Sequence, residues 1–174
     1  SNRDTRTRCA IIKMKRNIRR TCDWPGTNPL MVRYHDREWG TPLHNDRKLF
    51  EFMILDAFQA GLSWAIVMKK RKGFERAFRE FDADKIARFG ARDVKRLLHD
   101  EGIIRNRLKI AAAIENAKRF LYIQKEFGSF DKYIWQFVGG RPIIHRFKKL
   151  SELPAKTKES DAMSADLKRR GFKF

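Results

Sequence analysis

The apolar residues of this chain recur at the three- and four-residue spacing of α-helices, and this periodicity constrains the fold more than any other feature. The clearest example is the segment 46–60, whose apolar positions include Leu49, Phe50, Met53, Ile54, Ala57 and Phe58. Alternating β-branched runs bounded by turn residues, which would predict strands, are missing. The sequence therefore predicts an all-α protein.

Glycine, proline and capping residues divide the chain into helical segments. We expect helices over residues 45–60, 63–72, 74–81, 92–99, 106–127, 130–138 and 160–171, and a short helix capped by Asp82. In this prediction Gly61 ends the first helix, Gly73 separates the second from the third, and a tight turn at Gly102 joins two helices into a hairpin. Residues 22–45 hold three of the five prolines, so we expect loops with short helical turns there, and residues 141–157 are expected to be loop.

The charge balance points to a polyanionic partner. Forty Lys and Arg residues against twenty-one Asp and Glu give a formal charge of +19, which favours nucleic acid over an anionic membrane surface or an acidic protein. Residues 1–20 form a basic extension with eight basic residues and one acidic residue, and residues 21–174 are expected to form one domain. No apolar run approaches the roughly 20 residues of a membrane span. Two cysteines build no disulfide framework, which indicates a reducing cytoplasm.

The predicted hairpin carries a possible phosphate-binding site. A tight turn at Gly102 that leads into a helix points backbone N–H groups outward, and Arg105, Arg107 and Lys109 add positive charge. Such an element grips one DNA strand without reading its sequence. The alternative is an ordinary turn between two helices with a solvated basic face.

Aromatic residues and one carboxylate form a second candidate site. Trp24, Tyr34, Trp39 and Trp64 can stack an extruded base, and their π-faces attract a positively charged one; the alternative is core packing. Asp56 lies in an apolar run, where an inward-facing carboxylate needs a partner or a ligand donor; the alternative is a side chain that faces solvent.

Five short blocks follow one another along the chain: CDW at 22–24, YHDREWG at 34–40, QAGLSW at 59–64, GIIRNR at 102–107 and KRRGFKF at 168–174. Together they closely resemble the bacterial DNA-3-methyladenine glycosylase I family, from about residue 22 to the last residue. The resemblance implies a helix-hairpin-helix DNA glycosylase fold in which the irregular N-terminal segment contributes to the base pocket.

The implied activity is monofunctional: hydrolysis of the bond between 3-methyladenine and deoxyribose in alkylated duplex DNA, by a cytoplasmic monomer, to leave an abasic site. Because methylation at N3 makes the base cationic, it leaves as a neutral molecule, and strong general-acid catalysis is less necessary. Helix 106–127 accordingly places no acid close to the hairpin. The alternative is a non-catalytic DNA-binding module that recognises damaged or bent duplex.

The resemblance also implies residue roles. Asp56 takes the position of the family's base-recognising glutamate, with a shorter side chain, and is the candidate catalytic residue. Trp24, Tyr34 and Trp64 match pocket aromatics, whereas Met31 replaces another. The remaining matches concern DNA: Gly61 and Leu62 in the loop that plugs the duplex, Gly102, Arg105, Arg107 and Lys109 in the phosphate grip, and Arg169 and Arg170 on the backbone.

Zinc is the one cofactor that the resemblance implies. In similar proteins Cys22 and His35 would supply two ligands, and a later His and Cys in a C-terminal segment would supply the others. The sequence ends at Phe174, before that segment. Since a structural zinc site needs four ligands, Cys22 and His35 are expected to form a half-site only.

Overall fold

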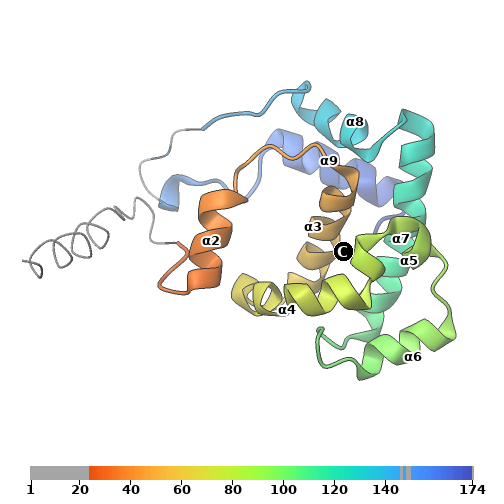
Figure 1. Ribbon diagram of the computed structural model, residues 1–174. Coiled ribbons are helices and arrows are strands. Elements are labelled where there is room, and N and C mark those ends of the chain that lie inside the picture. Colours follow the sequence, from red (N-terminus) through yellow and green to blue (C-terminus); the bar gives the residue numbers. More distant parts are fainter. Residues whose placement is uncertain (1–23, 146, 148–149, 174) are drawn as a thin grey trace, which may run out of the picture.

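The computed structural model describes residues 24–145, 147 and 150–173, and Figure 1 shows that their regular elements are helices. The longer ones are α2 (Pro29–Arg37), α3 (Asp46–Gln59), α4 (Trp64–Ala77), α6 (Ala91–His99), α7 (Arg107–Phe127) and α9 (Lys158–Arg169). The shorter ones are α5 (Ala83–Ala87), α8 (Phe130–Trp135) and the 3₁₀ turns η1 (Arg79–Phe81), η2 (Gln136–Val138) and η3 (Leu150–Glu152). The prediction of an all-α fold is confirmed.

Local side-chain caps explain where several helices begin. The side-chain oxygens of Asn45, Asn106, Ser129 and Thr157 each accept a hydrogen bond from the backbone N–H three residues further on. Each cap satisfies one of the amide groups that a helix leaves unpaired in its first turn. Gly128, in the left-handed conformation, ends α7. These boundaries are therefore properties of short stretches of sequence.

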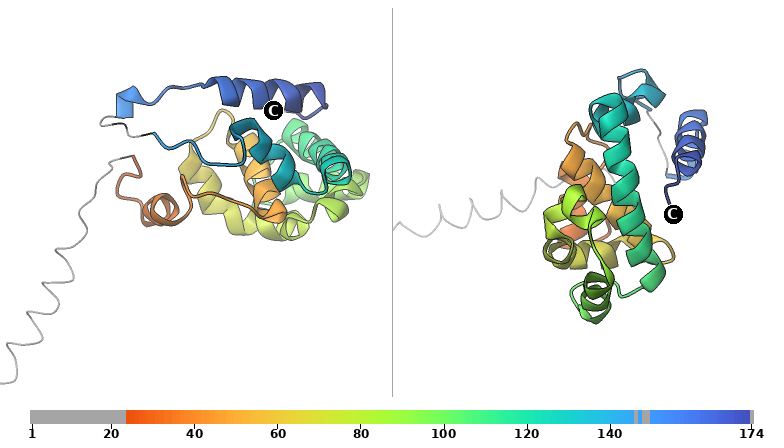
Figure 2. Two further views of the ribbon diagram at one scale, coloured as in Figure 1. Left: turned by 90° about the horizontal axis from the view of Figure 1, so that it is seen from above. Right: turned by 90° about the vertical axis from the view of Figure 1, so that its right-hand side faces the viewer.

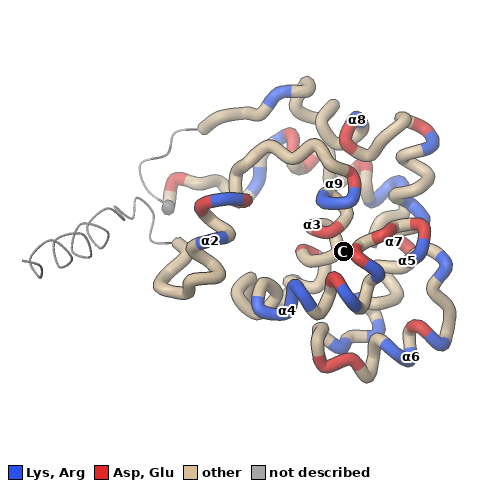
Figure 3. The backbone as a smooth tube through the Cα atoms, in the orientation of Figure 1, with Lys and Arg blue, Asp and Glu red and all other residues tan. Residues whose placement is uncertain are grey.

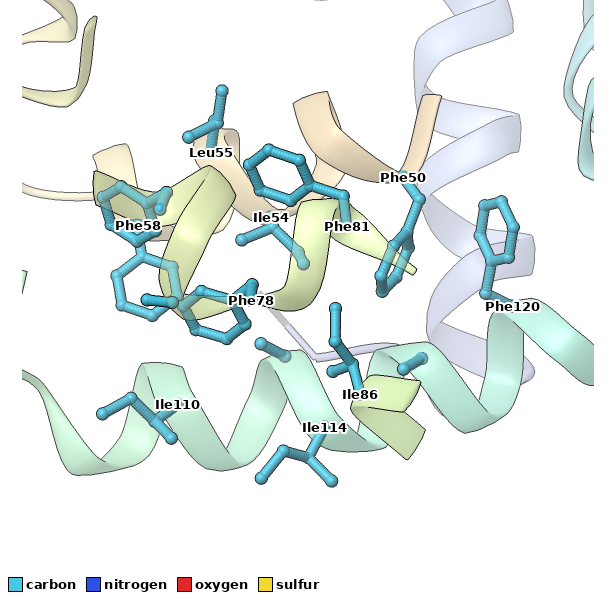
Figure 4. Close-up of a cluster of buried hydrophobic side chains, with 14 of the residues drawn as sticks. Phe50, Ile54, Leu55, Phe58, Phe78, Phe81, Ile86, Ile110, Ile114 and Phe120 are labelled. Atoms are coloured by element: carbon cyan, nitrogen blue, oxygen red, sulfur yellow. The ribbon is translucent and has the colours of Figure 1, made fainter. Parts of the chain in front are cut away.

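One apolar core holds α3, α4 and α7 together. Phe50, Ile54 and Phe58 of α3 lie in this core together with Ile110 of α7, and Phe50 packs against Phe120 (Figure 4). Phe74 of α4 and Phe78, which directly follows that helix, pack against Phe58. All of these side chains are essentially inaccessible to solvent. The long helix α7 contacts α3, α5, α6 and α8, so it is the central support of the bundle.

Helix α9 runs along the outside of this bundle, beside α7 and α8 (Figure 2). Polar contacts attach it: the Tyr133 hydroxyl donates to Asp166 at 2.8 Å, and Arg170 pairs with both Asp166 and Glu126. The guanidinium of Arg170 also lies 5.1 Å from the centre of the Tyr133 ring. After α9, Asn116 of α7 exchanges two hydrogen bonds with the backbone of Lys173.

Three details of the predicted helices need correction. Gly73 does not separate two helices, because α4 continues through it to Ala77. The residue is buried against the backbone of Gly102, where a larger side chain would not fit. Residues 79–81 do not continue a right-handed helix but form the left-handed turn η1, since Arg79, Glu80 and Phe81 adopt positive φ values of 51° to 57°. The segment 22–45 contains a longer helix than expected, the nine-residue α2.

No helix in the described part of the chain is both long and apolar enough to cross a membrane. The basic extension at residues 1–20 lies outside the described residues, as does Cys22.

Candidate base-binding and DNA-binding site

Six rings from α2, α3, α4 and the residues flanking α2 form one aromatic cluster. Tyr34 is central to it: its ring centre lies 5.5 Å from that of Trp64, 6.2 Å from that of Phe52 and 6.4 Å from that of Trp24. The other two members are His35 and Trp39, which stack on each other at 5.5 Å. The predicted base-binding aromatics Trp24, Tyr34 and Trp64 are therefore brought together from positions up to 40 residues apart.

Asp56 lies beside this cluster on α3. The residue is exposed, as the solvent-facing alternative expects, yet enough protein surrounds its carboxyl group that desolvation raises its pKa to about 6. Burial raises the pKa of Tyr34 above its usual value, and the negative charge of Asp56 raises it further. The carboxylate and the central ring of the cluster therefore share one electrostatic environment. A cation placed between them would meet an incompletely solvated negative charge.

Trp64 adds a buried polar group. Its indole Nε1 makes no hydrogen bond of ordinary geometry with the described residues, although it lies close enough to the Tyr34 hydroxyl to oppose the rise in the pKa of that group. Buried N–H groups are nearly always paired in folded proteins. An acceptor on a bound molecule would satisfy this donor.

Met31, which the sequence resemblance matches to an aromatic position, is buried in the core that includes Ile54 and Phe58. Its side chain thus belongs to the apolar packing beneath α2. A flexible thioether fills irregular space well, so the exchange preserves packing at this position without supplying a further ring.

A partly buried ion-pair network holds α2 against α3 and α4. Arg71 of α4 donates two hydrogen bonds of 2.8 Å to Glu38, which ends α2, and one of 2.6 Å to Glu51 of α3. Glu51 is only 4% exposed and also accepts from Lys48. The Arg71 guanidinium lies 5.2 Å from the centre of the Phe52 ring, which in turn contacts Tyr34.

This network escaped the sequence analysis because its members look like ordinary exposed charges of helices. The hydrogen bonds that Arg71 donates to Glu38 hold the pKa of this carboxyl group below its usual range. The partners are 20 and 33 residues apart, so no local spacing indicates that they meet.

The α3–α4 loop, residues 60–63, contains the predicted plug residues Gly61 and Leu62. Gly61 has a φ of +79°, a conformation that favours glycine. Gln59 braces the turn at both ends, because its side chain donates to the Leu62 carbonyl and its own carbonyl accepts from the Leu62 N–H, each at 2.7 Å. The Leu62 side chain is 37% exposed. An apolar side chain is thus presented to solvent on a well-supported turn.

The hairpin between α6 and α7 exists as predicted. The Asp100 side chain accepts from the Gly102 N–H at 2.7 Å, so this amide is used within the turn. Arg105, Arg107 and Leu108 are exposed at the start of α7, where the first-turn amides have no partner within the helix. Lys and Arg also line α4 and α6 nearby (Figure 3). The Lys109 N–H donates to the Asn106 cap, so the exposed tip of the hairpin presents the N–H groups of Arg107 and Leu108 next to positive charge.

Three of the predicted DNA contacts already have partners within the chain. Lys109 is buried, with its ammonium bonded to the carbonyls of Phe58 and Ala60 at the end of α3. Arg170 is bound to Glu126 and Asp166, and Arg169 pairs with Asp166 from a largely exposed position. Of these cations Arg169 is the most accessible.

The predicted half-site for zinc is represented by His35 alone. Its Nδ1 lies 2.9 Å from the Asp36 carboxylate, and its ring stacks on Trp39. No group of three His, Cys, Asp or Glu side chains within the described ranges is placed to hold a metal ion. The described donors do not by themselves fit a zinc site.

A basic helical hairpin next to an aromatic cluster can hold a DNA strand while one base leaves the stack. The fold and this site define a helix-hairpin-helix DNA glycosylase, and comparison with solved structures supports that class. Residues 24–174 match the family model for methyladenine glycosylases, and the chain belongs to that family.

Several characterised proteins are similar over most of their length. DNA-3-methyladenine glycosylase 1 of Escherichia coli K12 is 45% identical over 153 residues, which cover 88% of this chain and 82% of the relative. The Haemophilus influenzae enzyme is 42% identical, with 88% and 83% covered. A structure of the Staphylococcus aureus enzyme, concerned with 3-methyladenine recognition, superposes with a TM-score of 0.85 at 34% identity, covering 88% of this chain and 81% of that one.

Proposed function

We propose that this chain excises 3-methyladenine from alkylated duplex DNA with Asp56 and the aromatic cluster as its base-binding residues. As a member of the methyladenine glycosylase family it is a hydrolase of N-glycosidic bonds that acts in base excision repair. The observation that carries the assignment of residues is the convergence of Asp56 with Trp24, Tyr34 and Trp64.

The chemistry of the lesion explains why a carboxylate and aromatic rings suffice for recognition. Methylation at N3 gives adenine a positive charge, which is attracted by the π-faces of Trp24, Tyr34 and Trp64. The Asp56 carboxylate can accept hydrogen bonds from the base, and the partly desolvated surroundings strengthen its attraction to a cation. An undamaged, neutral adenine lacks the charge that these groups recognise.

Bond cleavage needs little further assistance from the protein. The bond between the base and C1′ of the sugar breaks, its electron pair neutralises the base, and water adds to C1′ and loses a proton to solvent. On α7 the nearest acid to the hairpin, Glu115, is bound to Arg119. We therefore assign Asp56 to base recognition and stabilisation of the cationic base, and no residue to proton donation.

On the DNA side we assign the phosphate contacts to the side chains of Arg105 and Arg107 and to the N–H groups of Arg107 and Leu108, with Arg169 as a further cation. Leu62, presented by the α3–α4 loop, would fill the space left by the flipped base. Gly102 shapes the turn, because its amide already donates to Asp100. We assign no phosphate contact to Lys109 or Arg170, since both are bound within the chain. We also propose that the enzyme acts as a monomer in the cytoplasm.

Release of the free base from methylated duplex DNA tests this function. Asp56→Asn removes the charge and keeps the size, and we expect at least a tenfold loss of excision rate, as for a lost hydrogen bond to a charged group of about 1.5–3 kcal/mol. Asp161→Asn, which neutralises an exposed carboxylate on α9, should excise at the wild-type rate.

Two results would contradict the proposal at different points. Excision by Asp56→Asn at the wild-type rate would remove Asp56 from base recognition. Salt-sensitive DNA binding without any base release by the wild type would instead favour the alternative, a non-catalytic module.

A further inference from the structure

Lys109 is a buried lysine in the first turn of α7. Its side chain is only 7% exposed, and its ammonium donates hydrogen bonds to the carbonyls of Phe58 at 2.9 Å and Ala60 at 2.5 Å. Phe58 lies in the last turn of α3 and Ala60 is the first residue after that helix, about 50 residues earlier in the chain than Lys109.

These bonds satisfy both partners. The last carbonyl groups of a helix accept no hydrogen bond from within the helix, and the negative end of the helix dipole at this terminus favours a cation. A buried ammonium is tolerated only when its protons are bound. The arrangement therefore ties the start of α7 to the end of α3 through a polar contact in an otherwise apolar region.

The two tied segments serve different parts of the proposed reaction. On one side lies the hairpin, whose turn is also held to α4 by the Gly73–Gly102 contact and by the bond from Lys70 to the Glu101 carbonyl. On the other side Asp56 precedes Phe58 on α3 by two residues, and the α3–α4 loop with Leu62 begins at Ala60. Lys109 is the link between them.

We propose that Lys109 is a positioning residue that sets the α3–α4 loop and Asp56 at a fixed place relative to the phosphates held by the hairpin. The inference rests on the proposed function. Extrusion of a base requires the plugging side chain to meet the duplex at the nucleotide that the hairpin has gripped. The hydrogen bonds of Lys109 fix the position of the α3–α4 loop relative to the hairpin, so the plugging side chain meets that nucleotide.

The salt dependence of DNA binding separates positioning from a direct phosphate contact. Each phosphate contact contributes about 0.9 to the slope of log affinity against log salt concentration. We expect Lys109→Met to keep the wild-type slope on undamaged duplex, whereas Arg105→Ala should lower it by about 0.9. Lys118→Met removes an exposed lysine from the same helix and serves as the matched charge control.

Single-turnover excision of 3-methyladenine then tests the coupling. We expect Lys109→Met to slow excision at least tenfold at saturating enzyme, and Lys118→Met to leave the rate unchanged. In a double-mutant cycle with Leu62→Ala, the excision rate of the double variant should fall by less than the product of the two single losses. This is expected because both substitutions act through the same loop. If Lys109→Met does not fold, Lys109→Gln, which keeps an N–H donor, takes its place in every comparison.

The inference is overturned if the slope falls by about 0.9, if excision stays at the wild-type rate, or if the losses from Lys109→Met and Leu62→Ala multiply. The last result is expected of a residue that merely supports the fold. Base release by the wild-type protein is measured in the same series, so failure of the proposed function would be seen separately.

Discussion

The close approach of α4 to the hairpin at Gly73 allows a sharp prediction for Gly73→Ala. A Cβ atom on Gly73 would lie 2.0 Å from the carbonyl oxygen of Gly102 and 2.6 Å from its carbonyl carbon. These are backbone atoms, and the turn that carries them is held by the Asp100 side chain and by Lys70. The helix and the hairpin must therefore separate to admit one methyl group.

Two opposing effects decide the sign of the change in stability. Alanine is favoured over glycine inside a helix by about 1 kcal/mol. Overpacking a rigid contact costs typically 1–3 kcal/mol, and a backbone clash this short belongs at the upper end. We expect a net loss of about 2 kcal/mol, which lowers the melting temperature by about 4–8 °C for a domain of this size.

Urea and thermal unfolding followed by circular dichroism measure this loss. The control is Gly90→Ala, where an added Cβ meets no atom within 4 Å and the change should stay below about 0.5 kcal/mol. DNA affinity should fall with Gly73→Ala because the hairpin moves. A variant as stable as the wild type, or more stable, would refute the close packing of α4 against the turn.

Three further predictions follow from the site. Because desolvation raises the pKa of Asp56 to about 6, kcat/KM should rise with pH through this value and level off above it as the carboxylate ionises, a limb that Asp56→Asn should lack. The same raised pKa means that the ionised Asp56 carboxylate destabilises the folded state. Asp56→Asn should therefore be more stable than the wild type above pH 6 and should lose that advantage below about pH 4. Urea titrations at several pH values measure this difference. Arg71→Met leaves Glu51 with Lys48 as its remaining partner, and we expect a loss of about 3 kcal/mol in unfolding free energy. We also expect weaker binding of free 3-methyladenine, measured by tryptophan fluorescence. Unchanged base binding would show that the ion-pair network does not position Tyr34.

Much of the secondary structure could be predicted because its causes are local. Asn45 and Asn106 cap helices through bonds to amides three residues away, and the apolar spacing from Leu49 to Phe58 selects the face of α3 that becomes core. Interactions over so few residues are visible in the printed sequence. The family blocks likewise identified the hairpin and the α3–α4 loop.

The predictions that failed concern contacts between distant residues. Glycine is disfavoured inside helices, so the sequence predicts that Gly73 separates two of them. Its buried contact with Gly102 instead favours a continuous helix, since only glycine lets the two backbones approach. Residues 79–81 continue a helical pattern in sequence, yet they form a left-handed turn that buries Phe81. In both cases packing outweighs local preference.

The site shows the same division. The sequence by itself determined the chemical inventory: a carboxylate at Asp56, aromatic rings on either side of it, and a basic hairpin. Only the tertiary structure decided which of these groups meet. It brought Trp24, Tyr34 and Trp64 together beside Asp56, and it turned Lys109 away from solvent to bind the end of α3. A side chain's charge is written in the sequence, but its burial and its partners depend on residues tens of positions away, which the chain brings close only when it folds.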